Sequence, residues 1–248
     1  TEGLLLLEDL GDDLVARVLE SEPALAPQIY QRMTDLLVDL HRHAPPAGLK
    51  KHGLDQWLDE VGLFTEWYCP AVGLDVDPDG FRAAWETVLA PVEAQGQTVT
   101  ELRDYHAENV MLIAGRDGID RFGLLDFQDA LVGHPAYDLV SMLEDARRDV
   151  SPSVETAQLS RYMADNGCGP AFEAAYWALG AQRNTRILGV FVRLWQRADK
   201  PHYRQFQSRM WGLLERNLAH PELAPLKAWF DANVPLDKRA SYWAEFAV

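Results

Sequence analysis

The chain has 248 residues, 48% of them hydrophobic and 25% charged, which is enough apolar material for one sizeable core. Its formal net charge of -15 argues against a nucleic-acid-binding surface, because affinity for a phosphate backbone depends on basic residues. No apolar run approaches the roughly 18–20 residues that a membrane span needs. The two cysteines, Cys69 and Cys168, lack metal-binding spacing, so we expect free thiols and a cytoplasmic protein.

The chain opens on an apolar segment that is typical of a buried strand. Four consecutive leucines occupy residues 4–7, and an acidic turn follows at residues 8–13. A native protein seldom begins inside a core strand, so we expect residues to precede Thr1 in the complete protein.

Apolar residues at helical spacing predict most of the remaining elements. The first predicted helices cover residues 14–19, 26–41, 54–68 and 81–94, the last of them capped by Asp79. Short apolar runs predict strands at 99–102, 110–114 and 122–125, with a hairpin turn at 115–118. Further helices are predicted at 139–147, 154–166, 171–197 with a break near Gly180, and 205–218, before a looser tail. The sequence therefore indicates a helical body that carries one small patch of strands and loops.

Three side chains in this patch suit phosphoryl transfer. Asp104 is followed five residues later by Asn109, and Asp126 comes directly after the third predicted strand. The reaction needs a carboxylate at the attacking hydroxyl and hard oxygen ligands for a Mg²⁺ ion that bridges the phosphates. Asp104 would orient the hydroxyl and accept its proton, while Asn109 and Asp126 would hold the metal. Each alone could be a surface residue, but their order and spacing between buried strands favour a catalytic site.

The same region resembles a known family. R-D-Y-H-A-E-N at residues 103–109, L-L-D-F-Q-D-A at 124–130 and G-H-P-A-Y-D-L-V at 133–140 are similar to the catalytic and metal-binding loops of the aminoglycoside phosphotransferase family. More narrowly, D-F-Q-D-A, the opening L-L-L-E-D-L-G-D, and G-V-F-V-R-L with K-P-H-Y after it resemble the bacterial kinases that phosphorylate N-acetylmuramate and N-acetylglucosamine at the anomeric hydroxyl. The resemblance covers nearly the whole chain. It implies a protein-kinase-like α+β fold, ATP and Mg²⁺ as cofactors, and an amino sugar of cell-wall recycling as acceptor.

The resemblance also implies roles for single residues. Asp104 would be the catalytic aspartate, Asn109 and Asp126 would bind Mg²⁺, and His106 would help to place the transferred phosphate. Packing within the loop is the alternative reading for His106. Arg103 and Asp138 would support the catalytic loop, Asp138 by binding its backbone N–H groups, with an ordinary helix N-cap as the alternative.

The adenine of the nucleotide would lie between the hinge and an apolar floor. The residues implied are Glu8, Asp9 and Leu10 in the hinge and Met111 in the floor, although a core methionine would look the same. By this reading residues 1–13 are a hinge strand and linker, and residues 14–248 are the helical C-lobe with its catalytic and metal-binding loops at 99–138.

Two features depart from the family pattern. Leu102 stands where members usually carry a histidine that supports the catalytic aspartate. The sequence also contains neither GxGxxG nor a strand-borne Ala-x-Lys, so we expect the β-rich N-terminal lobe that clamps ATP to be absent from this chain. A lost support lowers activity without abolishing it, whereas a lost lobe would prevent ordinary kinase activity.

The acceptor site in this family is built from helices after the hinge and near the C terminus. The candidates are Glu66, Trp67, Gln182, Arg183 and Arg186. An aromatic beside an acid suits a sugar ring, and an arginine suits the lactyl carboxylate of N-acetylmuramate, but each could be an ordinary core or surface residue. Two other functions stay open: a kinase for aminoglycosides or other small alcohols, which the acidic charge favours, and a non-catalytic pseudokinase. The role of Asp129 and the oligomeric state stay undecided.

Overall fold

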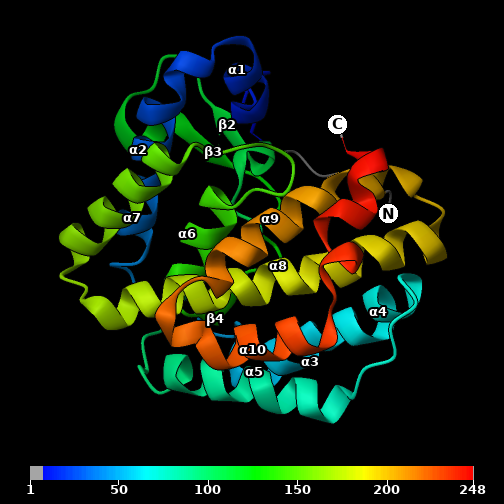
Figure 1. The fold of residues 1–248 in the computed structure, drawn as a ribbon. Helices are drawn as coiled ribbons and strands as arrows, with labels where there is room; N and C mark the ends of the chain where they lie inside the picture. Colours follow the sequence, from blue (N-terminus) through cyan, green and yellow to red (C-terminus); the bar gives the residue numbers. More distant parts are fainter. Residues whose placement is uncertain (1–7, 248) are drawn as a thin grey trace, which may run out of the picture.

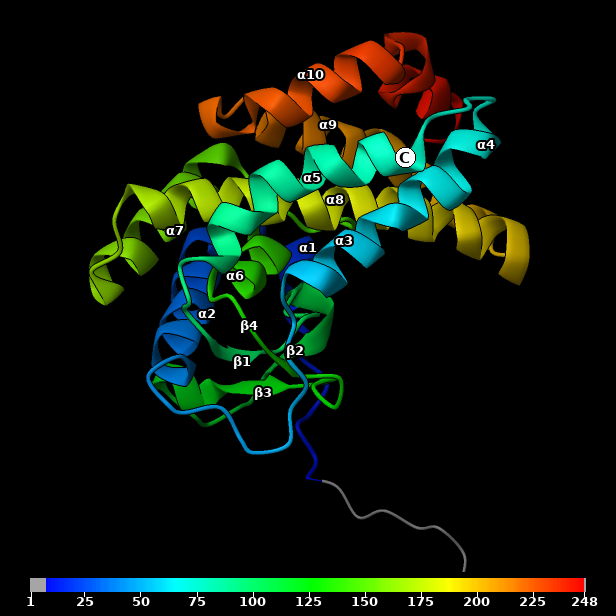
Figure 2. The same ribbon diagram turned by 90° about the horizontal axis from the view of Figure 1, so that it is seen from below.

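One long helix organises the molecule. The structure, a computed structural model, describes residues 8–247, so the strand predicted over residues 4–7 lies outside the described residues. Helix α8 (Pro170–Ala198) runs through the middle, and α3 (Leu54–Leu63), α5 (Pro78–Glu93), α6 (Ala136–Leu143) and α9 (Gln207–Leu218) pack against it (Figure 1). The other helices are α1 (Val15–Ser21), α2 (Ala26–Leu40), α4 (Cys69–Ala71), α7 (Pro152–Asn166) and α10 (Ala224–Asn233). Helices α9 and α10 lie on one side of α8, and α2, α6 and the strands lie on the other (Figure 2).

The strands form two separate antiparallel pairs. Strand β1 (Val99–Glu101) pairs with β4 (Leu131–Gly133), and β2 (Val110–Leu112) pairs with β3 (Phe122–Leu124). Each pair is extended by an isolated bridge, from Lys51 to Val132 and from Leu14 to Met111. The expected hairpin is confirmed, whereas β4 was missed because its three residues are too few to show an alternating pattern.

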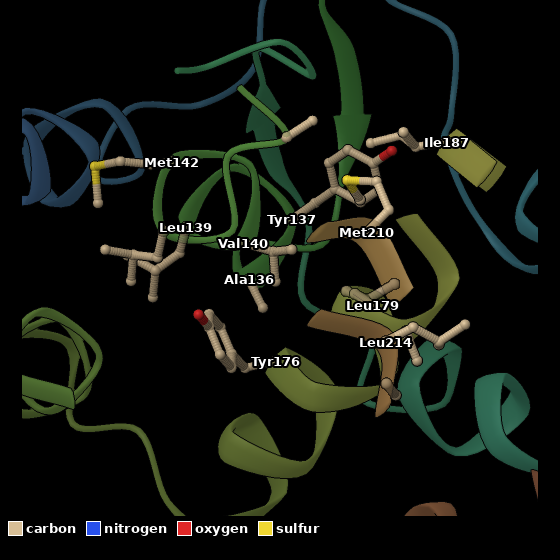
Figure 3. Packing of buried hydrophobic residues seen from close by; sticks show 14 of the residues in the cluster. Ala136, Tyr137, Leu139, Val140, Met142, Tyr176, Leu179, Ile187, Met210 and Leu214 are labelled. Atoms are coloured by element: carbon tan, nitrogen blue, oxygen red, sulfur yellow. The ribbon is translucent and has the colours of Figure 1, made fainter. Parts of the chain in front are cut away.

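Helix α6 packs against α8 inside the core. Every residue of α6 is buried, and its apolar side chains lie against Tyr176 and Leu179 of α8 and Met210 and Leu214 of α9 (Figure 3). A helix buried on all sides is apolar all round. Two polar residues of α6, Asp138 and Ser141, are buried as well, and the carboxylate of Asp138 requires polar partners inside the protein.

Several predicted helix details are wrong. Helix α5 begins at Pro78 and is capped by Asp77, whose carboxylate accepts from the backbone N–H groups of Asp79 and Gly80, because proline takes the first helical position. Helix α8 has no break at Gly180. A Cβ there would lie 2.8 Å from Nδ2 of Asn217, so this glycine makes room for a neighbouring helix. The tail after residue 218 also contains an ordered helix, α10.

Gly189 controls how closely α3 and α8 approach. The helix predicted over residues 54–68 is confirmed, and it ends in a π-helical turn, η2 (Phe64–Tyr68). A Cβ on Gly189 would lie 2.3 Å from the carbonyl oxygen of Leu63 and 2.8 Å from the backbone nitrogen of Phe64. Backbone atoms cannot rotate away as a flexible side chain can, so this contact requires glycine.

We expect Gly189→Ala to destabilise the protein. The added methyl group would force α3 and α8 apart, which should lower the free energy of unfolding by about 1–3 kcal/mol in urea denaturation. Gly212→Ala is the matched control, because Gly212 lies exposed on α9 with no atom within 4 Å of its would-be Cβ. That variant should be neutral or more stable by about 0.5–1 kcal/mol. Equal stability of the two variants would show that the helices can separate freely.

Candidate active site

The two strand pairs bring two loops together. The β1–β2 loop (residues 102–109) leaves β1 after Glu101 and enters β2 at Val110, while the β3–β4 loop (residues 125–130) leaves β3 after Leu124 and enters β4 at Leu131. Glu101 pairs with Leu131, and Val110 pairs with Leu124. Both loops therefore start and end at the same two paired positions, which places the predicted catalytic and metal-binding residues side by side.

Asp138 holds the start of the β1–β2 loop. Its carboxylate accepts from the backbone N–H of Leu102 at 2.6 Å and from that of Arg103 at 2.8 Å. It caps no helix, because α6 begins two residues earlier and has no side-chain cap. Burial raises the pKa of Asp138, and the two N–H donors act against that shift. The contact is the one that the family resemblance implies for this residue.

Asp104, Asn109 and Asp126 lie around the junction of the two loops. Nδ2 of Asn109 donates to the backbone oxygen of Asp104 at 2.9 Å, and the backbone N–H of Leu125 donates to the backbone oxygen of Asn109 at 2.9 Å. One oxygen of Asp126 accepts from Nε2 of Gln128 at 2.6 Å. The amide oxygen of Asn109 and the second carboxylate oxygen of Asp126 are thus the atoms that suit a hard cation.

Backbone strain is concentrated at the same place. Of the three non-glycine residues that have a positive φ within residues 8–247, Arg103 (71°) precedes Asp104 and Asp126 (57°) is a predicted metal ligand. A non-glycine residue in this region costs about 1–2 kcal/mol. Residues kept in such conformations cluster at functional sites, where the surrounding structure fixes them.

The residues predicted to contact adenine also meet, on the outer face of the β2–β3 hairpin. Val110 and Leu112 belong to the main core, whereas Met111 between them faces the other way and pairs with Gly123. A Cβ on Gly123 would lie 2.8 Å from Cδ1 of Leu10, so Leu10 packs directly on this glycine. Two exposed acids precede it: Glu8 pairs with Arg116 of the hairpin turn, and Asp9 accepts from the backbone N–H of Gly11.

His106 is buried within the β1–β2 loop. It is 6% exposed, and burial lowers its pKa to about 4, so the imidazole is neutral at physiological pH. A neutral, buried ring cannot place a positive charge beside a phosphate. This geometry favours the packing alternative for His106.

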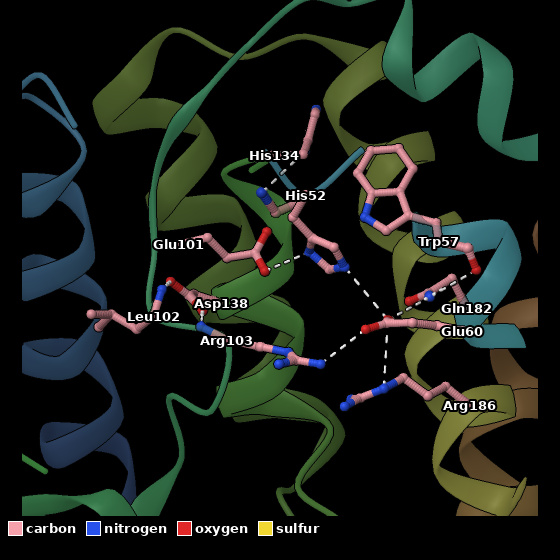
Figure 4. A network of polar contacts seen from close by, with 11 residues as sticks. His52, Trp57, Glu60, Glu101, Leu102, Arg103, His134, Asp138, Gln182 and Arg186 are labelled. Carbon is pink, nitrogen blue, oxygen red and sulfur yellow. Dashed lines mark hydrogen bonds and ion pairs between the residues drawn. The ribbon is translucent and has the colours of Figure 1, made fainter. Parts of the chain in front are cut away.

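A polar network faces the other side of the β1–β2 loop. Its centre is the carboxylate of Glu60 on α3, which lies 2.9 Å from Nη2 of Arg103 and 3.5 Å from Nε of Arg186 (Figure 4). Burial raises the pKa of Glu60, but the hydrogen bond from His52 and the charges of its cationic partners lower it to about 2. Sequence patterns missed Glu60 and His52, because the contacts that join them to the loop span more than 40 residues.

The predicted acceptor residues do not all lie at this network. Arg186 joins it, and the fully buried Gln182 donates to Glu60 and to the backbone oxygen of Trp57. Arg183 points instead to the backbone oxygen of Glu144 inside the core. Glu66, which is exposed, and the half-buried Trp67 lie on η2, roughly 9 Å beyond Glu60 along the helical axis. Gln182 and Arg183 therefore make hydrogen bonds within the protein. Arg186 is the residue of α8 that remains a candidate for binding the acceptor beside the β1–β2 loop.

A cavity of about 530 Å³ opens next to the network. It lies between α3, the β3–β4 loop and the segment before α3, and Glu60, Arg103, Gln128 and Asp129 line it. A second cavity, of about 590 Å³, lies at α9, and none of the predicted site residues lines it. The first volume is in the range of small-molecule sites, and its lining residues adjoin both loops.

The fold and these loops define a phosphotransferase of the protein-kinase-like class. The sequence model of the phosphotransferase enzyme family matches residues 2–177, and this chain belongs to that family. The chain is 44% identical to an N-acetylmuramate/N-acetylglucosamine kinase of Caulobacter vibrioides, over 96% of this chain and 69% of that protein. It is 32% identical to the protein of the same name from Neisseria meningitidis, over 91% of this chain and 70% of that protein.

Solved structures share the fold at low sequence identity. The choline kinase LicA from Streptococcus pneumoniae superposes with a TM-score of 0.56 at 16% identity, over 80% of this chain and 64% of that one. The aminoglycoside phosphotransferase APH(3'')-Id from Streptomyces rimosus gives a TM-score of 0.52 at 16% identity, over 72% of this chain and 68% of that one. This chain therefore spans about two thirds of the length of these proteins.

Two kinds of feature are missing from the part of the chain that the structure describes. No helix there has the length and apolar character needed to cross a membrane. No three His, Cys, Asp or Glu side chains gather there in a way that could hold a metal ion. The second result is consistent with a Mg²⁺ site of the kinase kind, which uses one or two protein carboxylates or amides together with phosphate oxygens and water.

We expect Asp138→Asn to destabilise the β1–β2 loop. The amide offers one acceptor and turns a donor toward a buried N–H, so the free energy of unfolding should fall by about 2–4 kcal/mol in chemical denaturation. Asp79→Asn is the control, because Asp79 also lies in the first turn of a helix but is exposed. A loss below about 0.5 kcal/mol in Asp138→Asn, the level of an ordinary surface change, would mean that the loop is held elsewhere.

Proposed function

We propose that this protein transfers the γ-phosphate of ATP, with Mg²⁺, to the anomeric hydroxyl of N-acetylmuramate or N-acetylglucosamine. The observation that carries the chemistry is the meeting of Asp104, Asn109 and Asp126 at the junction of the two loops. The choice of acceptor is supported by the names of relatives that are up to 44% identical over nearly the whole chain.

Asp104 is suited to act at the attacking oxygen. Its backbone is fixed by the hydrogen bond from Asn109 and by that from its own N–H to the oxygen of Leu102 at 2.8 Å. Its carboxylate is partly exposed, so a hydroxyl can reach it. The carboxylate would orient the acceptor hydroxyl and take its proton while the oxygen attacks phosphorus, and most of the catalysis would come from this positioning.

Asn109 and Asp126 are suited to hold the metal. Because Nδ2 of Asn109 is used by the loop, its amide oxygen is available, and Asp126 contributes a carboxylate from the facing loop. A bound Mg²⁺ would neutralise charge on the β- and γ-phosphates. Leu10 and Met111, with Gly123 between them, would form the apolar surface under adenine.

The cavity beside Glu60 is the acceptor site that the geometry supports best. Its acids and amides suit sugar hydroxyls, and Arg186 lies 3.5 Å from Glu60, one of the residues that line it. Burial lowers the pKa of Arg186, but Tyr137, Glu60 and Asp104 together raise it overall, so the guanidinium stays charged near Asp104. The lactyl carboxylate of N-acetylmuramate would bind this guanidinium.

An activity assay on the complete protein tests the function. ADP release is measured with Mg²⁺-ATP and four acceptors: N-acetylmuramate, N-acetylglucosamine, kanamycin and choline. Turnover of the amino sugars is expected, with the phosphate placed on the anomeric oxygen by ³¹P NMR. If only kanamycin or choline were phosphorylated, phosphoryl transfer would stand but the acceptor would be a different one. No turnover with any of the four acceptors would contradict the proposal.

We expect Asp104→Asn to lower kcat by about 10²- to 10⁴-fold, because the amide cannot accept the hydroxyl proton. Thermal stability should stay close to that of the wild type, since no hydrogen bond to the Asp104 side chain holds the loop among the described residues. Asp117→Asn, an exposed carboxylate at the hairpin turn, is the control. A kcat of Asp104→Asn near that of the control would contradict the assignment.

We expect Arg186→Gln to change the preference between the two sugars. Loss of one charge-assisted contact to the lactyl group should raise KM for N-acetylmuramate about 10- to 100-fold more than KM for N-acetylglucosamine, which lacks that group. Arg197→Gln, on the exposed last turn of α8, is the matched control. An equal rise in both KM values would mean that Arg186 supports the site without binding the lactyl carboxylate of N-acetylmuramate.

A further inference from the structure

A buried histidine outside the predicted site lies between two carboxylates. His52 precedes α3, and its backbone is fixed to β4: its N–H donates to the oxygen of Val132 at 2.7 Å, and the N–H of Val132 donates to the oxygen of Lys50 at 2.8 Å. The imidazole is 1% exposed and packs edge-on against Tyr137 and Trp57. These contacts hold the ring in one orientation.

Both ring nitrogens face a carboxylate. Nδ1 lies 2.7 Å from Oε1 of Glu101, and Nε2 lies 3.4 Å from Oε2 of Glu60 (Figure 4). A neutral imidazole can donate from only one nitrogen, so two facing carboxylates favour the protonated ring. Burial lowers the pKa of His52, but the hydrogen bonds and charges of Glu101 and Glu60 raise it to about 9.

Glu101 connects this ring to the start of the β1–β2 loop. It is the last residue of β1 and is fully buried, and the next residue, Leu102, is held by Asp138. The Glu101 side chain lies across Gly133 of β4, where a Cβ would come within 1.8 Å of Oε2. The carboxylate can take this place only because residue 133 is glycine.

Glu60 connects the same ring to the acceptor side. Its carboxylate binds Arg103, the residue before Asp104, and Arg186 on α8. The network therefore joins β1, α3 and α8 through one imidazole, and both of its ends reach the β1–β2 loop.

We propose that His52 is a positioning residue whose imidazolium fixes the β1–β2 loop, through Glu101, relative to the acceptor-side arginines, through Glu60. The inference rests on the proposed function. Without this cation, Glu101 would lose the charged hydrogen-bond partner of its fully buried carboxyl group, whose pKa burial raises, and Glu60 would lose one of its three cationic partners. Asp104 would keep its chemistry but lose its defined place beside the acceptor.

The protonation of His52 gives the proposal a pH signature. The charged and titratable groups around it are Glu101 on β1, Glu60 on α3, Tyr137 on α6, Arg186 on α8, Arg103 on the loop, and the neighbouring Lys51–Glu93 pair. The pKa of His52 is raised above its ordinary value, so the charged ring holds the loop fully below about pH 6.5. This contribution is lost as the pH rises through about 9 and the ring loses its proton. Burial raises the pKa of Tyr137 further above this range.

The first test compares His52→Gln with the wild type in the complete protein. Glutamine keeps a donor but carries no charge, so kcat at pH 7.5 should fall about 10- to 100-fold while KM for ATP stays unchanged. Wild-type kcat should decline as the pH rises through about 9, and the variant should lack that decline. His134→Gln is the matched control, because His134 is a buried histidine nearby that bonds to Gln95 and to neither carboxylate.

The second test does not depend on the acceptor. Amide hydrogen exchange of a peptide covering residues 101–106 should be faster in His52→Gln than in the wild type, and unchanged in His134→Gln. His52→Gln could instead lower the thermal stability while leaving the amide exchange, kcat and the decline of kcat at alkaline pH as in the wild type. That result would make His52 a purely structural residue and would overturn the proposal. If the wild type phosphorylates neither amino sugar, the proposed function fails, and the exchange rates alone then decide whether His52 positions the loop.

Discussion

The site depends on one backbone constraint, the pairing of β1 with β4 and of β2 with β3. Each pair has only three residues per strand, too little to be stable alone, so the pairs persist because helices cover them. Because the residues that flank one loop pair with those that flank the other, the two loops lie next to each other. The carboxylate of Asp138 accepts the two hydrogen bonds that fix the β1–β2 loop. Because α6 is buried, a polar side chain on it must find its hydrogen-bond partners inside the protein.

The two loops are flanked by two different segments of the chain, one attached to β2 and the other attached to β4. The segment before α1 is attached to β2 through Leu14 and Met111, which brings Leu10 onto the hairpin. The segment before α3 is attached to β4 through Lys51 and Val132, which brings His52 and then Glu60 to the other side. The surface proposed for the nucleotide and the surface proposed for the acceptor therefore lie on either side of the two loops, where the phosphoryl group would pass.

The sequence singles out the candidate residues of this site more readily than the residues that support them. Asp104, Asn109 and Asp126 fall at fixed offsets beside apolar runs, and such local order survives in a linear pattern. Helices such as α2 were predictable because their apolar residues recur at helical spacing. Glu60 and His52 carry no such signal: each is one charged residue among many, and its meaning comes from partners 40 or more residues away. Gly180 misled the prediction for a similar reason, since its role is to admit Asn217 from another helix.

The net charge of the chain bears on how the proposed acceptor side would bind an anion. The chain carries a net charge of -15, so an anionic acceptor would approach a repulsive surface unless cations stood at the site itself. Arg103 and Arg186 supply those cations, yet two guanidinium groups near each other repel and would otherwise turn toward bulk solvent. Glu60 lies within ion-pair distance of both guanidinium groups, and the hydrogen bond from His52 lowers the pKa of Glu60. Glu60 is therefore the shared counter-ion that keeps Arg103 and Arg186 close together on this side of the β1–β2 loop.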